Sequence, residues 1–434
     1  MMATPETGLI GIVVLLLLLL LGVPIGGALG LVGLGGLTLI LGFEPALFKA
    51  GDLVLETLTR YELGTLPLFM LMAHLCFSSD ASRDLFDAAA RWIGHRRGGL
   101  ALASVAGCAG FGAINGSSLA TAATIGLVAI PEMRRHGYSD ALATGSVAAG
   151  GTLGQMIPPS GALIVFGIIA QQSIGTLFTA AIVPGLSQAL LYMVVISLLV
   201  RWRPSLAPQT AKADWPSRWQ ALGKVVDILI LMLVVIGGIV FGLFTPSEAA
   251  SVGAAGALGI SLWRRRLSWS ALYHSLEETL KTSGLIYVVI VGTLIFSVFI
   301  SITGLATAAG ALITDFEGGR TLTVMLMAIF LLVLGSLLDG LALILIATPI
   351  LLPVTVAMGP SPIWFGIFIV RAAEIGFIHP PMGMNLYVIQ GIAPDVPLSR
   401  IFRGVLPFLA ADFLHLLLLI LFPALVLALP GWMA

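Results

Sequence analysis

The chain has 434 residues, of which 58% are hydrophobic and only 10% charged, and its formal net charge is zero. A soluble domain carries about 25% charged residues, and the mean hydropathy here is +1.07. These values exclude a soluble globular protein, and the charge balance gives no general attraction to nucleic acid. We expect an all-α integral membrane protein in the lipid bilayer, because the roughly ten-residue alternating segments of a membrane barrel are not visible.

The N-terminal stretch 1–24 is apolar and carries one charged residue, Glu6. It lacks the positive region that begins a secretory signal, so we expect a retained first helix. Cys76 and Cys108 lie within apolar segments, a context that favours buried free thiols. No cysteine or histidine spacing indicates a disulfide framework or a transition-metal site.

Two Pro-Pro pairs, 158–159 and 380–381, interrupt apolar segments where a helix would otherwise continue. They are separated by 222 residues, and the same offset relates Gly154 to Gly376 within a shared pattern, P-x5-G-x16-G-x3-P-P. Internal repeats of this kind are common in transporters. We therefore expect two repeats, at 1–212 and 213–434. The expected parts are a hairpin at 100–131 and a broken helix at 140–172, matched by a hairpin at 322–357 and a broken helix at 362–392.

Charge orients these repeats, because lysine and arginine are enriched in cytoplasmic loops. The basic segments "GHRRGG" (94–99) and "MRRHGY" (133–138) flank the run 100–131, so that run must return to the side from which it entered. With five net spans and one re-entrant hairpin in each half, most of the 21 basic residues lie in the cytoplasm. Five is odd, so the second repeat is inverted relative to the first, and both termini are periplasmic.

Inverted-repeat transporters place their ligands near the membrane midplane, at hairpin tips and discontinuous helices. Freed backbone groups there must line a cavity or the protein interior, where carbonyl and hydroxyl oxygens can ligate a hard cation. In the first half, the candidates are Asn115, Ser117, Ser118 and Thr121 at the tip, and Gly154, Pro158, Pro159 and Ser160 at the break. Close packing of helices through small residues is the alternative interpretation for the cluster at the tip.

The second half carries charged candidates. Asp339 falls opposite Ser117 at the 222 offset, and it could ligate a cation or cap the following helix. Arg371 could meet a substrate carboxylate or pair with Glu374 three residues later. The break itself contributes Gly376, Pro380, Pro381 and Asn385; Asn385 could contact substrate or satisfy the broken backbone.

Two amphipathic stretches, 43–61 and 266–282, occupy matching places in the halves. Each could lie flat at a membrane interface as an arm that braces a scaffold. A solvated linker is the alternative for either one.

Four motifs together carry a resemblance: "FGAINGSSLATAATIG" (111–126), "GGTLGQMIPPSGALIVFG" (150–167), "LLDGLALILIATPILLP" (337–353) and "IGFIHPPMGMNLY" (375–387). Over nearly its whole length the chain resembles the large membrane (DctM-type) subunit of tripartite ATP-independent periplasmic (TRAP) transporters. The resemblance implies an inner-membrane secondary transporter driven by sodium, with an elevator mechanism. It also implies sodium sites at Ser117 and Ser118 with Gly154, and at Asp339 with Gly335 and Gly376.

The family works with a small four-helix membrane (Q-type) subunit and a periplasmic substrate-binding (P-type) protein, and its substrates are mostly organic acids. We expect both partners here as separate chains, and no cofactor besides Na⁺. The sequence departs from the family at His379, where threonine is common, and at Arg371 and Glu374. A single-component sodium- or proton-coupled carboxylate transporter of the same architecture is the alternative. A membrane enzyme is disfavoured, since no HExxH motif or phosphate loop is present.

Overall fold

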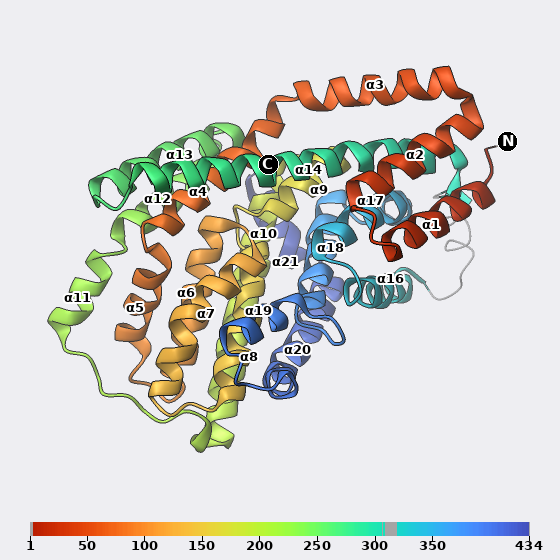
Figure 1. Ribbon diagram of the computed structural model, residues 1–434. Helices are drawn as coiled ribbons and strands as arrows, with labels where there is room; N and C mark the ends of the chain where they lie inside the picture. Colours follow the sequence, from red (N-terminus) through yellow and green to blue (C-terminus); the bar gives the residue numbers. More distant parts are fainter. Residues whose placement is uncertain (1–2, 306, 309–318, 434) are drawn as a thin grey trace.

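The computed structural model describes residues 3–305, 307–308 and 319–433, and within this part every regular element is a helix. Figure 1 shows the arrangement. The first half comprises α1 (Pro5–Leu20), α2 (Ile25–Leu41), α3 (Phe43–Thr59), η1 (Tyr61–Gly64), α4 (Thr65–Ser78), α5 (Ala81–Ile93), α6 (Gly99–Asn115), α7 (Ser118–Arg135), α8 (Asp140–Met156), α9 (Gly161–Ala170), α10 (Ile174–Trp202) and η2 (Pro204–Leu206). The second half comprises α11 (Trp215–Gly223), α12 (Val226–Val240), α13 (Pro246–Trp263), α14 (Trp269–Thr303), α16 (Gly319–Gly335), α17 (Gly340–Ala357), α18 (Pro362–Gly376), α19 (Met384–Ile392), α20 (Leu398–Leu421) and α21 (Ala424–Met433).

Helices are the expected solution here, because lipid cannot satisfy exposed backbone groups. Many begin at a residue whose side chain accepts a hydrogen bond from the first turn. Ser139 caps α8 and Ser268 caps α14, while Thr245 and Glu248 form a reciprocal capping box at the start of α13. The sequence thus marks its own helix starts within a composition that is apolar almost throughout.

The helices pack into two groups. The first, which we call the frame, comprises α1–α4 and α12–α14; the long helix α14 packs against both α2 and α4, and α4 packs against α13 (Figure 1). The second, which we call the body, comprises α5–α10 and α16–α21, in which α8 contacts α6, α7 and α20. Contacts between frame and body are sparser and include α4 with α6 and α14 with α17.

Within the described residues, five helical segments are long and apolar enough to cross a membrane singly, and seven are if two bent pairs count as one span each. One bent pair joins α4 and α5 at 65°, and the other joins α11 and α12 at 49°. The expected five net spans per half therefore stay a prediction, as does the placement of the termini.

Helix pairs and helix interruptions lie at the positions of the expected hairpins and breaks, while the division into two repeats and the re-entrant course of the hairpins stay predictions. α6 and α7 meet at Gly116 and Ser117, and the backbone N–H of Leu100 donates to the Tyr138 hydroxyl (3.2 Å), so the two ends of this hairpin lie side by side. The second hairpin turns between α16 and α17, and the breaks separate α8 from α9 and α18 from α19. The boundaries of α7 and α17 differ by the same 222 residues. The inverted orientation of the two halves stays a prediction.

The placement of the two amphipathic stretches at membrane interfaces stays a prediction, but the stretches differ in the structure. The stretch 43–61 contains the separate helix α3, whereas residues 269–282 form the first part of the continuous 35-residue helix α14. The cause is visible in the sequence: Pro67, in the first turn of α4, has Val289 as its partner at the 222 offset, inside α14. Proline favours a helix start, whereas valine lets the helix continue.

Candidate functional site

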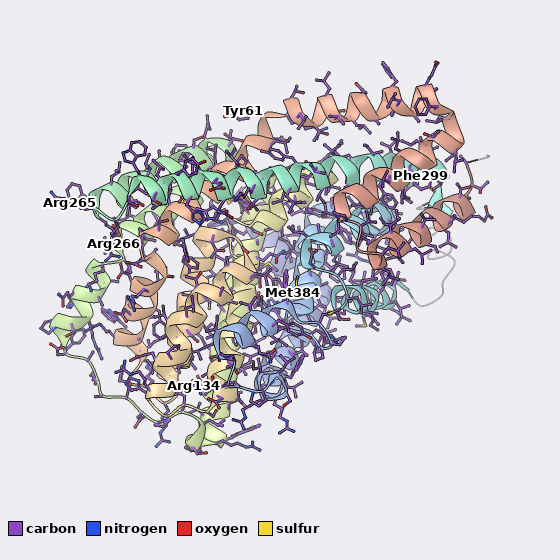
Figure 2. The ribbon with its side chains drawn as sticks, in the orientation of Figure 1. Tyr61, Arg134, Arg265, Arg266, Phe299 and Met384 are labelled. Carbon is purple, nitrogen blue, oxygen red and sulfur yellow. The ribbon has the colours of Figure 1, made fainter. Side chains whose placement is uncertain are left out.

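A cavity of about 290 Å³ lies where frame and body meet. Its body side is formed by the two hairpin tips and the two helix breaks, and its frame side by α4 and α14. Figure 2 places Met384, one of its lining residues, at the start of α19 in the middle of the molecule. The interrupted segments of both halves thus converge on one site.

The first hairpin tip is held by Asn115. Its Oδ1 accepts from the backbone N–H of Ser117 (2.6 Å), and its Nδ2 donates to Thr121 Oγ1 (2.8 Å). Gly116 adopts a φ of +64°, a conformation that glycine tolerates best. Ser117 then caps α7 by accepting from the backbone of Ala120. The tip is therefore a rigid turn that presents backbone and hydroxyl oxygens.

The first break packs tightly against this tip. A methyl group added at Gly154 would lie 2.3 Å from Thr121 Oγ1 and 2.6 Å from the Ser117 carbonyl oxygen. One added at Gly116 would lie 2.5 Å from the carbonyl oxygen of Pro159. Only glycine permits these approaches, so backbone oxygens of the tip and the break are gathered within a few ångströms of one another.

The second tip and break repeat this arrangement. A methyl group at Gly376 would lie 2.3 Å from the carbonyl oxygen of Gly335. Asp339 caps α17, accepting from the backbone N–H of Ala342 (2.9 Å), and its carboxylate also faces the cavity. The structure thus supports both interpretations of Asp339, as a helix cap and as an available oxygen donor.

Four helix N-termini end at the same cavity. Its lining includes Ser118 of α7, Gly161 of α9, Leu341 of α17 and Met384 of α19, each in the first turn of its helix. A helix N-terminus carries a partial positive charge and unpaired N–H groups, and such ends bind anions. The cavity therefore combines a positive backbone field with oxygen donors for a cation.

Asn385 ties the second break to the first hairpin. It is fully buried, and its Nδ2 donates to Ser118 Oγ (2.9 Å) and to the carbonyl oxygen of Ala148 in α8 (3.0 Å). It does not line the cavity. These contacts favour a role in joining α19 to α7 and α8 over direct contact with a ligand.

Arg371 also lies away from the cavity. It is fully buried, and it donates to Glu374 Oε2 (3.0 Å), to Asp412 Oδ1 and to His415 Nδ1 (3.1 Å). The pair with Glu374 is confirmed, and the structure does not bring Arg371 to a position where it could meet a carboxylate in this cavity. Asp412 and His415, which lie on α20, were not predicted as partners of Arg371.

The sequence-predicted residues divide into two sets around the cavity. Those that line it are Asn115, Ser117, Ser118, Pro159 and Asp339. Those that do not line it are Thr121, Gly154, Pro158, Ser160, Gly335, Arg371, Gly376, Pro380, Pro381 and Asn385. Of the second set, Thr121 and Gly154 directly support the first tip, and Ser160 caps α9 by accepting from Leu163.

Sequence reasoning missed the frame side of the cavity. Phe69 and Met70 of α4 and Ile286 and Thr282 of α14 line it, as does Gln155 beside the first break. Gln155 could have been suspected as a buried amide next to Gly154. The apolar residues carry no such signal, because one apolar residue in a membrane helix looks like any other.

The comparisons with known proteins agree with this geometry. Residues 12–425 match the family model described as the DctM component of tripartite ATP-independent periplasmic transporters. The chain is 35% identical to the C4-dicarboxylate TRAP transporter large permease protein DctM of Pseudomonas aeruginosa, with 92% of this chain and 94% of that one covered. It is 31% identical to the sialic acid TRAP transporter large permease protein SiaM of Vibrio cholerae, with 95% and 96% covered.

A solved structure shares the fold. The YdaH transporter of Alcanivorax borkumensis, described as having an unusual topology, superposes with a TM-score of 0.56 at 16% identity and covers 98% of this chain and 99% of that one. The matched relatives are transporter permeases, so this is a multi-pass membrane transport protein and not an enzyme. The chain belongs to the DctM family, the large permease subunits of tripartite ATP-independent periplasmic transporters.

Proposed function

We propose that this subunit carries a small organic acid across the inner membrane into the cell, coupled to sodium. The observation that carries the proposal is the convergence of four helix N-termini and one carboxylate on a single cavity. The N-termini favour an anion, while Asp339 and the backbone oxygens favour a hard cation. A cavity that holds both fits cotransport, because each ion neutralises the other.

The sodium ligands would come from both tips. At the first, the Ser117 carbonyl lies against Gly154, and Ser118 stands beside it; at the second, the Gly335 carbonyl lies against Gly376, with Asp339 nearby. The glycines let these carbonyls approach the helix breaks, where backbone groups are free of helical hydrogen bonds.

Transport would follow an elevator mechanism in which the body carries the site past the frame. The sparser packing between the two groups than within them supports this proposal. A periplasmic binding protein would deliver the substrate and a small Q-type permease would complete the membrane unit, as the family name implies. Organic acids are the named substrates of the relatives, C4-dicarboxylate and sialic acid among them.

Reconstitution distinguishes a permease that needs both partners from the single-component carboxylate transporter. With both partners present in proteoliposomes, we expect sodium-driven uptake, and none by this chain alone. Uptake by this chain alone would favour a transporter that needs no binding protein.

Replacing Asp339 with asparagine is expected to weaken the apparent sodium affinity of uptake by at least about tenfold, because loss of a charge-assisted contact costs roughly 1.5–3 kcal/mol. The amide keeps an oxygen that can still cap α17, so the fold should persist. Asp214→Asn, at the N-cap position of α11 and far from the cavity in sequence and fold, is the control. An unchanged sodium response in the Asp339 variant would remove this carboxylate from the ion site.

Cysteine labelling is expected to place the two ends of the first hairpin on one face of the membrane. The natural thiols of Cys76 and Cys108 are buried, so the background from membrane-impermeant reagents should be low. Arg97→Cys and Arg135→Cys should react from the cytoplasmic face, and Arg320→Cys, at the start of the second hairpin, from the periplasmic face. Labelling of all three from one face would overturn the inverted repeat.

A further inference from the structure

The lining of the cavity is strongly asymmetric. The hairpin tips contribute hydroxyl, amide and carboxylate groups, whereas Leu66, Phe69 and Met70 of α4 and Ile286 of α14 form an apolar wall on the frame side, to which α14 adds one hydroxyl group, that of Thr282. Phe377, just after α18, adds an aromatic ring from the body. A ligand that fills this space meets polar groups at one end and hydrocarbon at the other.

The charge inventory of the cavity limits the ligand further. No arginine, lysine or histidine is among its described lining residues, and Asp339 is its only carboxylate. One anionic end can be held by the helix N-termini and a bound cation. A second carboxylate would face the apolar wall without a partner, and burying an unpaired charge is strongly unfavourable.

An adjoining cavity of about 450 Å³ does not change this inventory. It shares Met70, Asn115, Ser117 and Thr282 with the first, and it adds His74, His274 and Glu278. No lysine or arginine is among the described residues that line this second space, and Glu278 adds a carboxylate. It offers no fixed positive charge to a further carboxylate.

The apolar wall also limits hydrogen bonding. A large polyhydroxylated acid would need more hydrogen-bonding groups than Leu66, Phe69, Met70 and Ile286 supply.

We propose that the substrate is a small monocarboxylate with an apolar body. Its carboxylate would lie against the N-termini of α7, α9, α17 and α19, and its hydrocarbon part against Phe69, Met70 and Ile286. This inference rests on the proposed function, since it presumes that the cavity is the transport site. It differs from what the names of the relatives suggest for them, namely a dicarboxylate and a sugar acid.

A homologous series tests the inference. Binding of propanoate, butanoate, pentanoate and hexanoate to the purified permease in sodium buffer would be measured by calorimetry or by competition. We expect affinity to rise about fourfold for each added methylene until the cavity is full. Succinate should bind at least about tenfold more weakly than pentanoate, because its second charge is unpaired. Tighter binding of succinate or of gluconate would overturn the inference while leaving the proposed anion transport intact.

A matched pair of variants assigns the effect to the wall. Ile286→Thr places a hydroxyl in the cavity, whereas Ile302→Thr makes the same change sixteen residues along α14, at a side chain that is 36% exposed and does not line this cavity. We expect Ile286→Thr to flatten the methylene dependence and Ile302→Thr to preserve it. An equal change in affinity per methylene in both variants would show that the hydrocarbon part of the ligand contacts another part of the protein. Absence of any sodium-dependent binding in the unmodified protein would instead count against the proposed function itself.

Discussion

Replacing Arg371 with methionine is expected to lower the free energy of unfolding by about 3–5 kcal/mol, because it leaves two buried carboxylates without their counter-charge. Arg371, Glu374 and Asp412 have no exposed side-chain surface. Among the described residues, Arg371 is the only cation paired with the carboxylates of Glu374 and Asp412. Denaturant or thermal unfolding of the purified protein in detergent would measure the loss.

The control is an ion pair of similar chemistry at the surface. Arg400 donates to Asp140 Oδ2 (3.0 Å) and is 56% exposed, so Arg400→Met should cost at most about 1 kcal/mol. Removing the charges together, in Arg371→Met with Glu374→Leu and Asp412→Leu, should recover much of the loss, since apolar replacements of a buried ionic cluster are often neutral. Equal effects of Arg371→Met and Arg400→Met would show that the buried cluster is not a stability determinant.

Further polar contacts link this cluster, which lies on α18 and α20, to α10 and from there to α8. His415 contacts Ser187 of α10 through Nε2 (2.9 Å), and Gln188 of α10 donates to Thr152 of α8 (3.0 Å). Thr152 lies two residues before Gly154, as Glu374 lies two residues before Gly376. Buried polar contacts thus lie close in sequence to both breaks and outside the cavity lining, which fits a role in fixing the positions of α8 and α18.

Features of the fold and the site that depend on local sequence were predictable, and features that depend on tertiary packing were not. The hairpin tips and breaks follow from proline and glycine placed in apolar segments, and these residues act on their own backbone. The short-range pair of Arg371 with Glu374 was accessible from its spacing. Asp412 and His415 were not, because they approach Arg371 only through the packing of α20 against α18.

The cavity was predictable on one side only. The tips carry polar residues in apolar surroundings, which is unusual enough to notice; Ser117 and Asp339 are examples. The opposite wall is built from apolar residues such as Phe69 and Ile286, whose selection depends on how α4 and α14 sit against the body. The continuous course of α14 has no positive signal in the sequence, because it depends on the absence of a proline at 289 and the amphipathic pattern of 266–282 does not show it.

Replacing Gly376 with alanine is expected to impair sodium-driven uptake strongly. The new methyl group would lie 2.3 Å from the Gly335 carbonyl oxygen, and that oxygen belongs to the backbone, so the hairpin or the helix break must move. Overpacking of this kind costs about 1–3 kcal/mol. If the cost falls on the sodium-bound state, apparent sodium affinity should drop between about fivefold and a hundredfold. Gly154→Ala should act similarly through the Ser117 carbonyl.

Gly391 offers a matched comparison, because it lies in α19 on the far side of the same break, and nothing is within 4 Å of a methyl group added there. Gly391→Ala should leave uptake and its sodium dependence unchanged, and a helical alanine should not reduce stability. Uptake at several sodium concentrations separates the two variants. Normal sodium affinity in both Gly376→Ala and Gly154→Ala would mean that the close approach of tip and break serves packing alone, and the sodium ligands would then have to be sought elsewhere in the body.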